Sequence, residues 1–260
     1  MSTLAEGAVV QGRVLTALML REIHTINGNS KLGYLWVLIQ SVFGIAVFWG
    51  VRAFMGAHAP HGMSVPIFLA IGFGLWNIFS GGITRCMNAV DGNRGLLTFP
   101  QVTEFDVMLA RVIVITATQI LTSAIIIAVS VLFGSEFRPA SAPLFLLVLI
   151  TVPLLSLGMG MVLSSLAVFL PVLEKLVPMA LRILFFVSGV FFVVSAFSHQ
   201  IAEWLLFNPL MQGIELMRMA LHMGYVTDGL DPEYLCAFTV ISLTLGGLFE
   251  RYVRRRRLSQ

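Results

Sequence analysis

Residues 143–170 read PLFLLVLITVPLLSLGMGMVLSSLAVFL, and this stretch decides the fold. It has no charged side chain, and it exceeds the roughly 20 apolar residues that a helix needs to cross the hydrocarbon core of a bilayer. The rest of the chain is similar, because 58% of its 260 residues are hydrophobic and only 11% are charged. Soluble domains carry about 25% charged residues. The sequence therefore predicts an all-α integral membrane protein, since helices satisfy their own backbone groups in lipid.

Outward from that stretch, the hydropathy pattern predicts six transmembrane helices. They cover 34–54, 66–83, 107–133, 143–170, 177–197 and 234–250. The stretch 201–224 is a poor span, because it holds Glu203, Glu215 and Arg218 and is interrupted by Pro209. It predicts a re-entrant or interfacial pair of short helices before the last span.

The expected pair of short helices has two interpretations. Glu215 and Arg218 lie three residues apart and are expected to pair on one helical face. The segment then shapes the outer mouth of the protein or contacts a periplasmic partner. The simpler alternative is an amphipathic cap that lies on the outer leaflet.

The direction of the spans follows from Lys and Arg residues, which gather in cytoplasmic loops. With both termini cytoplasmic, the outer side holds only Arg52, Arg138 and Arg218 of the 16 Lys and Arg residues, which leaves 13 on the inner side. The imbalance predicts a multi-pass protein of the bacterial inner membrane with both ends in the cytoplasm.

The region before the first span predicts a helix along the cytoplasmic membrane surface. Residues 10–26 show an apolar stripe, although Val14 and Leu18 interrupt the polar face. The stripe consists of Leu15, Met19, Ile23 and Ile26. The following turn, NSKLGYLW at 29–36, places Lys31 and two aromatic rings at headgroup depth, where such rings are favoured.

These segments predict one transmembrane domain over 1–260. Residues 1–33 form the interface helix, 34–250 hold the six spans, and 251–260 form a basic cytoplasmic tail. We expect the tail RYVRRRRLSQ to bind anionic lipid rather than nucleic acid.

Several chemistries have no sequence support. The two lysines, Lys31 and Lys175, lie outside any G-x-x-x-x-G-K-[ST] loop, so the chain has no phosphate-binding loop of its own. His58 and His61 share a short outer loop and are expected to be solvated rather than to hold a metal. No acidic residue lies in the middle of a span, where an ion-coupled carrier needs one. The chain is expected to take its energy from another protein and to be no enzyme by itself.

Three stretches resemble the membrane subunit of type-two ABC exporters, and within these the KpsM-like permeases that export capsular polysaccharide in Gram-negative bacteria. They are LREIHTINGNSKLGYLWVLIQ at 20–40, NRGLLTFPQVTEFDVMLAR at 93–111 and NPLMQGIELMRMAL at 208–221. The resemblance covers essentially the whole chain. It implies a homodimeric conduit worked by two copies of a cytoplasmic ATPase subunit, which binds the ATP and Mg. It further implies a lipid-linked acidic polysaccharide as cargo and a periplasmic co-polymerase or export protein as a further partner.

An ATPase outside the membrane must push on a rigid element of the permease. We expect a short coupling helix near 92–99, whose apolar side chains fill a notch on the partner, with a second contact in the loop 171–177. An ordinary amphipathic connector is the alternative. The candidate contact residues are Asp91, Asn93, Arg94, Leu96, Leu97, Phe99, Glu174 and Lys175.

A sliding polymer needs weak, repeated contacts, which aromatic faces and arginines provide. The candidate residues along the path are Tyr34, Trp36, Trp49, Arg52, Trp76, Arg85, Arg111 and Arg182. Each aromatic ring has packing or lipid contact as its alternative role, and each arginine has anchoring at the membrane surface.

Other functions remain open at this point. The nearest is an ABC permease for another lipid-linked glycan, of O-antigen or teichoic-acid type, or for a small hydrophobic molecule. A membrane enzyme acting on lipids and a membrane scaffold are more distant alternatives.

Overall fold

The computed structural model describes residues 2–27, 39, 42–44, 46–47, 50, 60–93, 95 and 102–258. Every regular element in these ranges is helical, as predicted. The helices are α1 (Ser2–Asn27), α3 (Val65–Met87), α4 (Glu104–Leu132), α5 (Ala142–Phe169), α6 (Leu173–Val187), α7 (His199–Leu206), α8 (Pro209–Leu221) and α9 (Pro232–Leu258), with 3-10 turns η1 (Pro60–Gly62), η2 (Asp91–Asn93) and η3 (Val194–Ala196).

Part of the expected site lies outside the described residues. These positions are Lys31, Tyr34, Trp36, Trp49, Arg52, His58, Arg94, Leu96, Leu97 and Phe99. In the expected first span, residues 39, 42–44, 46–47 and 50 are helical. A Cβ atom built at Gly44 lies 3.6 Å from Phe73 Cε1, so this stretch packs beside α3.

Four helices of the described residues, namely α3, α4, α5 and the part of α9 up to Arg254, are long and apolar enough to cross a membrane. They confirm the spans expected at 66–83, 107–133, 143–170 and 234–250, with ends that shift by a few residues. The start of α4 is fixed by a capping box, in which Thr103 Oγ1 accepts the Asp106 amide at 3.3 Å and Asp106 Oδ2 accepts the Thr103 amide at 2.9 Å.

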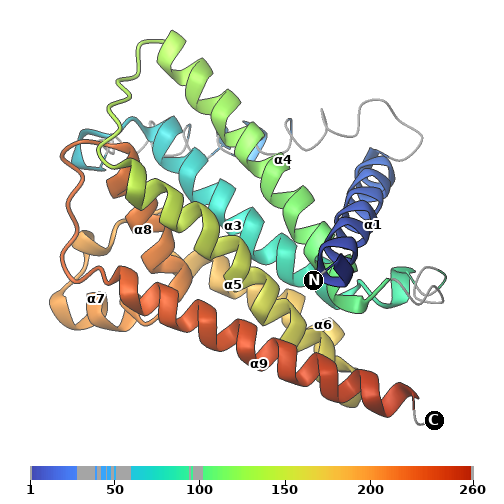
Figure 1. Cartoon of the computed structure of the whole chain (residues 1–260). Helices are drawn as coiled ribbons and strands as arrows, with labels where there is room; N and C mark the ends of the chain where they lie inside the picture. The colour runs from blue at the N-terminus through green and yellow to red at the C-terminus, as the bar shows by residue number, and fades with distance from the viewer. Residues whose placement is uncertain are drawn as a thin grey trace.

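The four long helices pack with their ends at two opposite sides of the bundle (Figure 1). We name the side that holds α1, η2 and the C-terminal end of α9 the α1 end, and the side that holds α7, α8 and the loop 133–141 the α8 end. Helix α5 packs on α3 and α9. The backbones of α5 and α9 touch, because a Cβ atom at Gly246 would lie 2.8 Å from the carbonyl oxygen of Gly158.

Helix α6 is the main departure from the expected spans. The sequence predicts a helix over 177–197, but α6 ends at Val187 and has 15 residues, which is about 22 Å of helix against the roughly 30 Å of a bilayer core. The chain turns at Gly189, whose φ of 74° favours glycine. A Cβ atom there would also lie 2.2 Å from Met211 Sδ, so the close approach of α8 leaves no room for a side chain at this position.

Helix α1 confirms the expected N-terminal helix but corrects its buried face. Leu18, which the sequence pattern places on the polar side, is 8% exposed and packs with Val14, Leu15 and Met19 beside the buried residues of α3 and α4. The face of α1 that contacts the bundle is therefore centred on Leu18 and includes Leu15 and Met19 of the predicted stripe.

The stretch 201–224 forms two helices, as predicted, and they break at Asn208 and Pro209. Asn208 Oδ1 accepts the Leu210 amide at 3.0 Å and begins α8. Most side chains of α8 are buried, and α8 packs on α3, α5 and α9, whereas α7 buries none. The interpretation as an amphipathic surface cap is therefore wrong for α8, which is inserted into the bundle.

Candidate functional site

A groove of about 420 Å³ runs between α3 and α6 and is the strongest candidate for a binding site at the depth of the membrane. Three polar side chains of α3 line one wall, namely Asn77, Ser80 and Thr84. They lie three and four residues apart and share one face of the helix. The opposite wall is formed by α6 and includes Arg182, which is exposed.

Aromatic rings form the rest of the groove. The centre of the Phe185 ring lies 5.2 Å from that of Trp76, 5.7 Å from that of Phe73 and 5.3 Å from that of Phe186. These distances are typical of edge-to-face aromatic contacts. The groove therefore combines aromatic faces, hydroxyl and amide groups and one guanidinium, a set that can hold a sugar or an anionic headgroup.

The structure brings together only some of the predicted path residues. Trp76 and Arg182 line the same groove. Arg85 and Arg111 do not line it and instead pair with Glu22 of α1, which the sequence analysis did not single out.

Glu22 holds α1 against the two arginines at the α1 end. Arg85 Nη1 lies 3.0 Å from Glu22 Oε1, and Arg111 Nε lies 3.4 Å from Glu22 Oε2. Arg111 Nη1 also donates to the backbone carbonyl of Arg85 at 2.8 Å. The side chains of Arg111 and Glu22 are each 14% exposed, so these ion pairs are largely shielded from solvent. They join α1 to α3 and α4.

Two further contacts attach α1 to the region expected to meet an ATPase. Gln11 donates a hydrogen bond to Asp106, and Arg21 donates one to Asn93 of η2. Asn93 is 5% exposed and also donates to the Ala89 carbonyl at 2.7 Å. Residues 91–93, expected to begin a coupling helix, thus form a 3-10 turn bound to α1.

The other expected contact with an ATPase lies in the first turn of α6. Glu174 and Lys175 lie in that turn, directly after the first residue of the helix, Leu173, and both are exposed. They are therefore accessible at the α1 end, on the same helix as the groove residues Leu181 and Arg182 but outside the groove.

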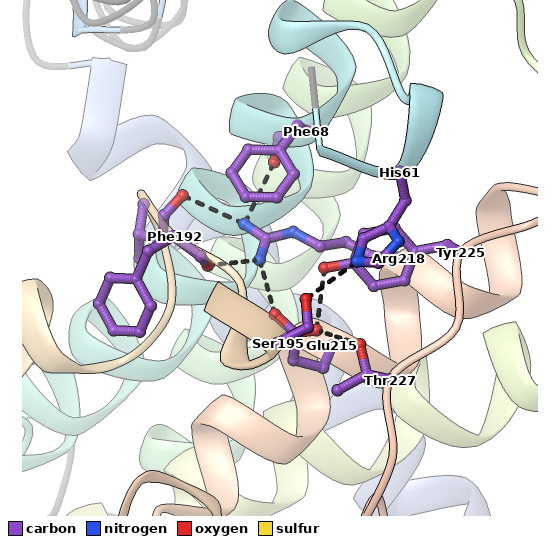
Figure 2. A network of polar contacts seen from close by, with 9 residues as sticks. His61, Phe68, Phe192, Ser195, Glu215, Arg218, Tyr225 and Thr227 are labelled. Carbon is purple, nitrogen blue, oxygen red and sulfur yellow. Dashed lines mark hydrogen bonds and ion pairs between the residues drawn. The ribbon is translucent and has the colours of Figure 1, made fainter. Parts of the chain in front are cut away.

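A buried polar network occupies the α8 end (Figure 2). At its centre Arg218 and Glu215 are each fully buried. Arg218 donates to Glu215 Oε1 at 3.1 Å and to the backbone carbonyls of Val190 at 3.1 Å, Phe192 at 3.2 Å and Phe68 at 3.5 Å. The predicted pairing of Glu215 and Arg218 is confirmed, but it lies in the core rather than on a surface.

The second oxygen of Glu215 is also satisfied. Oε2 accepts the Tyr225 hydroxyl and the Thr227 hydroxyl, each at 2.8 Å. Burial raises the pKa of the Tyr225 phenol, so Tyr225 stays protonated and donates. The network continues to the surface of the α8 end, where the His61 ring contacts Tyr225 and its Nε2 lies 3.0 Å from Ser195 Oγ.

The guanidinium of Arg218 satisfies carbonyls that the break after α6 leaves unpaired. Residues 188–193 follow the end of the helix, and the carbonyls of Val190 and Phe192 have Arg218 as a donor. Backbone groups that leave a helix in a protein interior need such partners. Pro209 lies at the first position of α8. Proline has no backbone N–H, and an N–H at this position would have no intrahelical acceptor, so the helix loses no hydrogen bond there.

Sequence reasoning missed several residues of these clusters. Asn77, Ser80 and Thr84 repeat at helical spacing inside an apolar span, which is a visible pattern. Glu22 is an acidic residue in the N-terminal helix, whose prediction used only the apolar stripe and the basic residues. Tyr225 has no local pattern, because its partner Glu215 lies ten residues away across a turn.

With the geometry established, the comparisons with known proteins identify the class. The chain belongs to the family described as ABC-2 type transporter, whose profile matches residues 13–222. Together with the four apolar helices, this identifies the chain as the multi-pass membrane permease component of a transporter, rather than an enzyme.

Curated relatives are similar along nearly the whole chain. The polysialic acid transport protein KpsM of Escherichia coli is 29% identical over 240 residues, which cover 92% of this chain and 93% of the relative. The capsule polysaccharide export inner-membrane protein CtrC of Neisseria meningitidis is 24% identical, over 93% of this chain and 91% of the relative. The protein of the same description from Haemophilus influenzae, BexB, is 25% identical, over 93% and 89%.

Proposed function

We propose that this chain is the inner-membrane permease of an ATP-driven exporter of lipid-linked capsular polysaccharide. The observation that carries the proposal is the similarity over more than nine-tenths of the chain to a polysialic acid transport protein and two capsule polysaccharide export proteins. Two copies form the conduit, and two copies of a separate ATPase subunit bind ATP and Mg at the cytoplasmic side. The chain crosses the membrane six times.

The groove between α3 and α6 supports a glycan as cargo. Phe186, which is exposed, offers a ring face on which a sugar can stack, and Ser80 and Thr84 offer hydroxyl groups on the opposite wall. Trp76 is buried behind Phe185 and supports this wall. Arg182 suits the phosphate or carboxylate of an acidic, lipid-linked polymer. The groove opens toward lipid at α6, whose Ile183 and Phe186 are exposed, so a lipid anchor can remain in the bilayer while the headgroup enters.

The charge distribution supports a cytoplasmic α1 end. The inner loops and the tail RYVRRRRLSQ carry most of the cations, and positive loops remain on the cytoplasmic side. The ATPase then contacts this end through η2, the stretch that follows it and the first turn of α6. The α8 end faces the periplasm and the export protein located there.

A complementation experiment tests the function. In a strain that lacks this chain but keeps its polymer-synthesis enzymes, we expect polysaccharide to accumulate inside the cell and the surface polymer to disappear. Supplying the chain restores surface polymer, measured by binding of a polymer-specific antibody to intact cells. Undiminished surface polymer in the deleted strain would remove the proposal.

The same strain separates the alternatives. If an O-antigen or teichoic-acid type glycan is the cargo, that glycan accumulates inside and the capsule stays intact. If the cargo is a small hydrophobic molecule, no glycan changes location and only sensitivity to such molecules rises. Purification of the chain with or without an ATPase subunit then tests the energy source independently.

A further inference from the structure

A second cavity, of about 660 Å³, lies at the α8 end and takes no part in the groove. Its walls come from η3, α7, α8 and the stretch 227–234 that leads into α9. Because the apolar span of α9 begins at Pro232, the preceding loop lies beyond the end of that span. His199 and Glu203 on its edge are exposed, so solvent reaches the cavity. Its volume is in the range of protein sites that bind ligands.

The hydrogen-bond donors of the cavity wall are already used within the chain. The Tyr234 hydroxyl donates to a backbone carbonyl at 2.7 Å, and the Thr227 hydroxyl donates to the buried Glu215 at 2.8 Å. The Gln212 amide donates to a backbone carbonyl at 3.1 Å and accepts a backbone amide at 3.0 Å. The wall therefore has little capacity to donate to a guest.

Acceptor capacity, in contrast, remains. Three carboxylates line the cavity, those of Glu203, Asp228 and Asp231, and no Lys or Arg among the described residues lines it. Glu203 Oε1 lies 3.2 Å from His199 Nδ1, so this carboxylate has its second oxygen left for a guest. One oxygen of Asp231 accepts the amides of Glu233 and Tyr234, which caps α9 and leaves its second oxygen open. A guest must therefore donate hydrogen bonds and carry positive charge.

The surrounding sequence strengthens the negative charge. Residues 199–233 contain five carboxylates, of Glu203, Glu215, Asp228, Asp231 and Glu233, and one cation, Arg218, so their formal charge is 1 − 5 = −4 in a chain of net charge +3. Because Arg218 and Glu215 pair in the core, the remaining negative charge is that of four carboxylates, of which all but Glu233 line the cavity. The rings of Phe197, Phe207 and Tyr234 add faces that attract a cation.

We propose that this cavity is the docking site for a basic side chain, arginine or lysine, of a protein on the outer side of the membrane. The inference rests on the proposed function, which places the α8 end outside. A metal ion fits less well, because the described residues contain no group of three acidic, His or Cys side chains arranged to hold one. An anionic lipid headgroup fits less well, because the carboxylates of Glu203, Asp228 and Asp231 repel it.

A binding measurement on the purified complex of permease and ATPase in nonionic detergent tests the site. The probe is the peptide acetyl-GRGRG-amide, with acetyl-GEGEG-amide as the opposite-charge control, measured by calorimetry at low and high salt. We expect only the arginine peptide to bind, with an affinity that falls as salt rises. The double variant Asp228→Asn/Glu203→Gln should bind it at least tenfold more weakly.

The matched control is Glu136→Gln. Glu136 is an exposed carboxylate at the same end, paired with Arg138 at 3.2 Å and outside the cavity. It should leave the affinity unchanged. Equal binding by the double variant and the unaltered protein, or an equal loss in Glu136→Gln, overturns the proposal. Displacement of the peptide by phosphatidylethanolamine would also overturn it, because the guest would then be a lipid headgroup.

A labelling experiment separates failure of the docking site from failure of the proposed function. Asp228→Cys, in a Cys236→Ser background, should react with a membrane-impermeant maleimide in intact cells whose outer membrane has been made permeable. Reaction only after the inner membrane is lysed places the cavity in the cytoplasm, which overturns both the docking of an outer protein and the proposed orientation. Peptide binding needs no polymer, so it holds or fails independently of the exported cargo.

Discussion

The guanidinium carbon of Arg218 lies 3.5 Å from the centre of the Phe68 ring, and both side chains are buried. This contact joins α8 to the first half of α3. The same guanidinium binds the carbonyls of Val190 and Phe192 beyond the end of α6. One side chain thus connects three segments of the α8 end.

Replacing Arg218 is expected to destabilise the protein strongly. Arg218→Met keeps most of the apolar bulk but leaves Glu215 as an unpaired buried carboxylate, and loss of one partner of a buried ion pair costs about 3–5 kcal/mol. Thermal unfolding in detergent should show a clear fall in the melting temperature. The double variant Glu215→Gln/Arg218→Met should be less damaged than the single one, and Arg138→Gln, at an exposed ion pair, should change little.

Gly72 is expected to tolerate no side chain. A Cβ atom there would lie 3.0 Å from the Val190 carbonyl and 3.1 Å from Arg218 Nη2. Gly72→Ala should therefore cost about 1–3 kcal/mol, as overpacking does in other cores, measured as a lower melting temperature. Gly247→Ala is the matched control, because no atom lies within 4 Å of its Cβ position. There alanine should be neutral or stabilising, and similar melting temperatures for the two variants would contradict the close approach.

Glu22 is expected to hold α1 on the bundle. Glu22→Ala removes the shared partner of Arg85 and Arg111, so α1 should detach more often. The measurement is the maleimide labelling rate of Leu18→Cys, since Leu18 is 8% exposed against the bundle. Labelling should accelerate several-fold in Glu22→Ala and stay unchanged in Arg13→Gln, which alters an exposed residue of the same helix. Equal rates in all three backgrounds would show that the apolar contacts alone hold α1.

Arg182 is expected to act on the cargo rather than on stability. It is exposed in the groove and has no ion pair among the described residues, so Arg182→Gln should leave the amount of folded protein unchanged while surface polymer falls several-fold. Arg182→Lys keeps the charge but loses the two-pronged geometry of the guanidinium and should give an intermediate level. Flow cytometry with a polymer-specific antibody, beside a membrane immunoblot, makes the measurement. Normal surface polymer with Arg182→Gln would assign Arg182 to membrane anchoring alone.

Much of the fold was predictable because the lipid bilayer restricts the structures that a long apolar segment can form. Four of the expected spans are confirmed within a few residues, since a long apolar run in a bilayer has little alternative to a helix. The helix over 177–197 was predicted too long, because the residues on both sides of Gly189 are equally apolar and hydropathy does not detect a turn. The turn at Gly189 lies against Met211 of α8, a contact between segments far apart in the sequence that the hydropathy pattern does not contain.

The polar clusters were predictable only in part. The pairing of Glu215 with Arg218 follows from their spacing along one helix, and it was predicted. The burial of this pair was not predicted, because it depends on the packing of α8 against α3 and α5. Arg85 and Arg111 were read as path residues or anchors, yet their partner Glu22 is more than sixty residues away from either. Such pairings become visible only when the helices are placed in space.

The contact between Gly158 and Gly246 has a mechanical consequence. Because the two backbones approach closely there and the helices pack along their length, we expect α5 and α9 to move together. Helix α6, in contrast, buries only Val177 and Leu181. Any rearrangement of the bundle is therefore expected to move α6 more readily than α5 or α9, because α6 has fewer buried contacts to break.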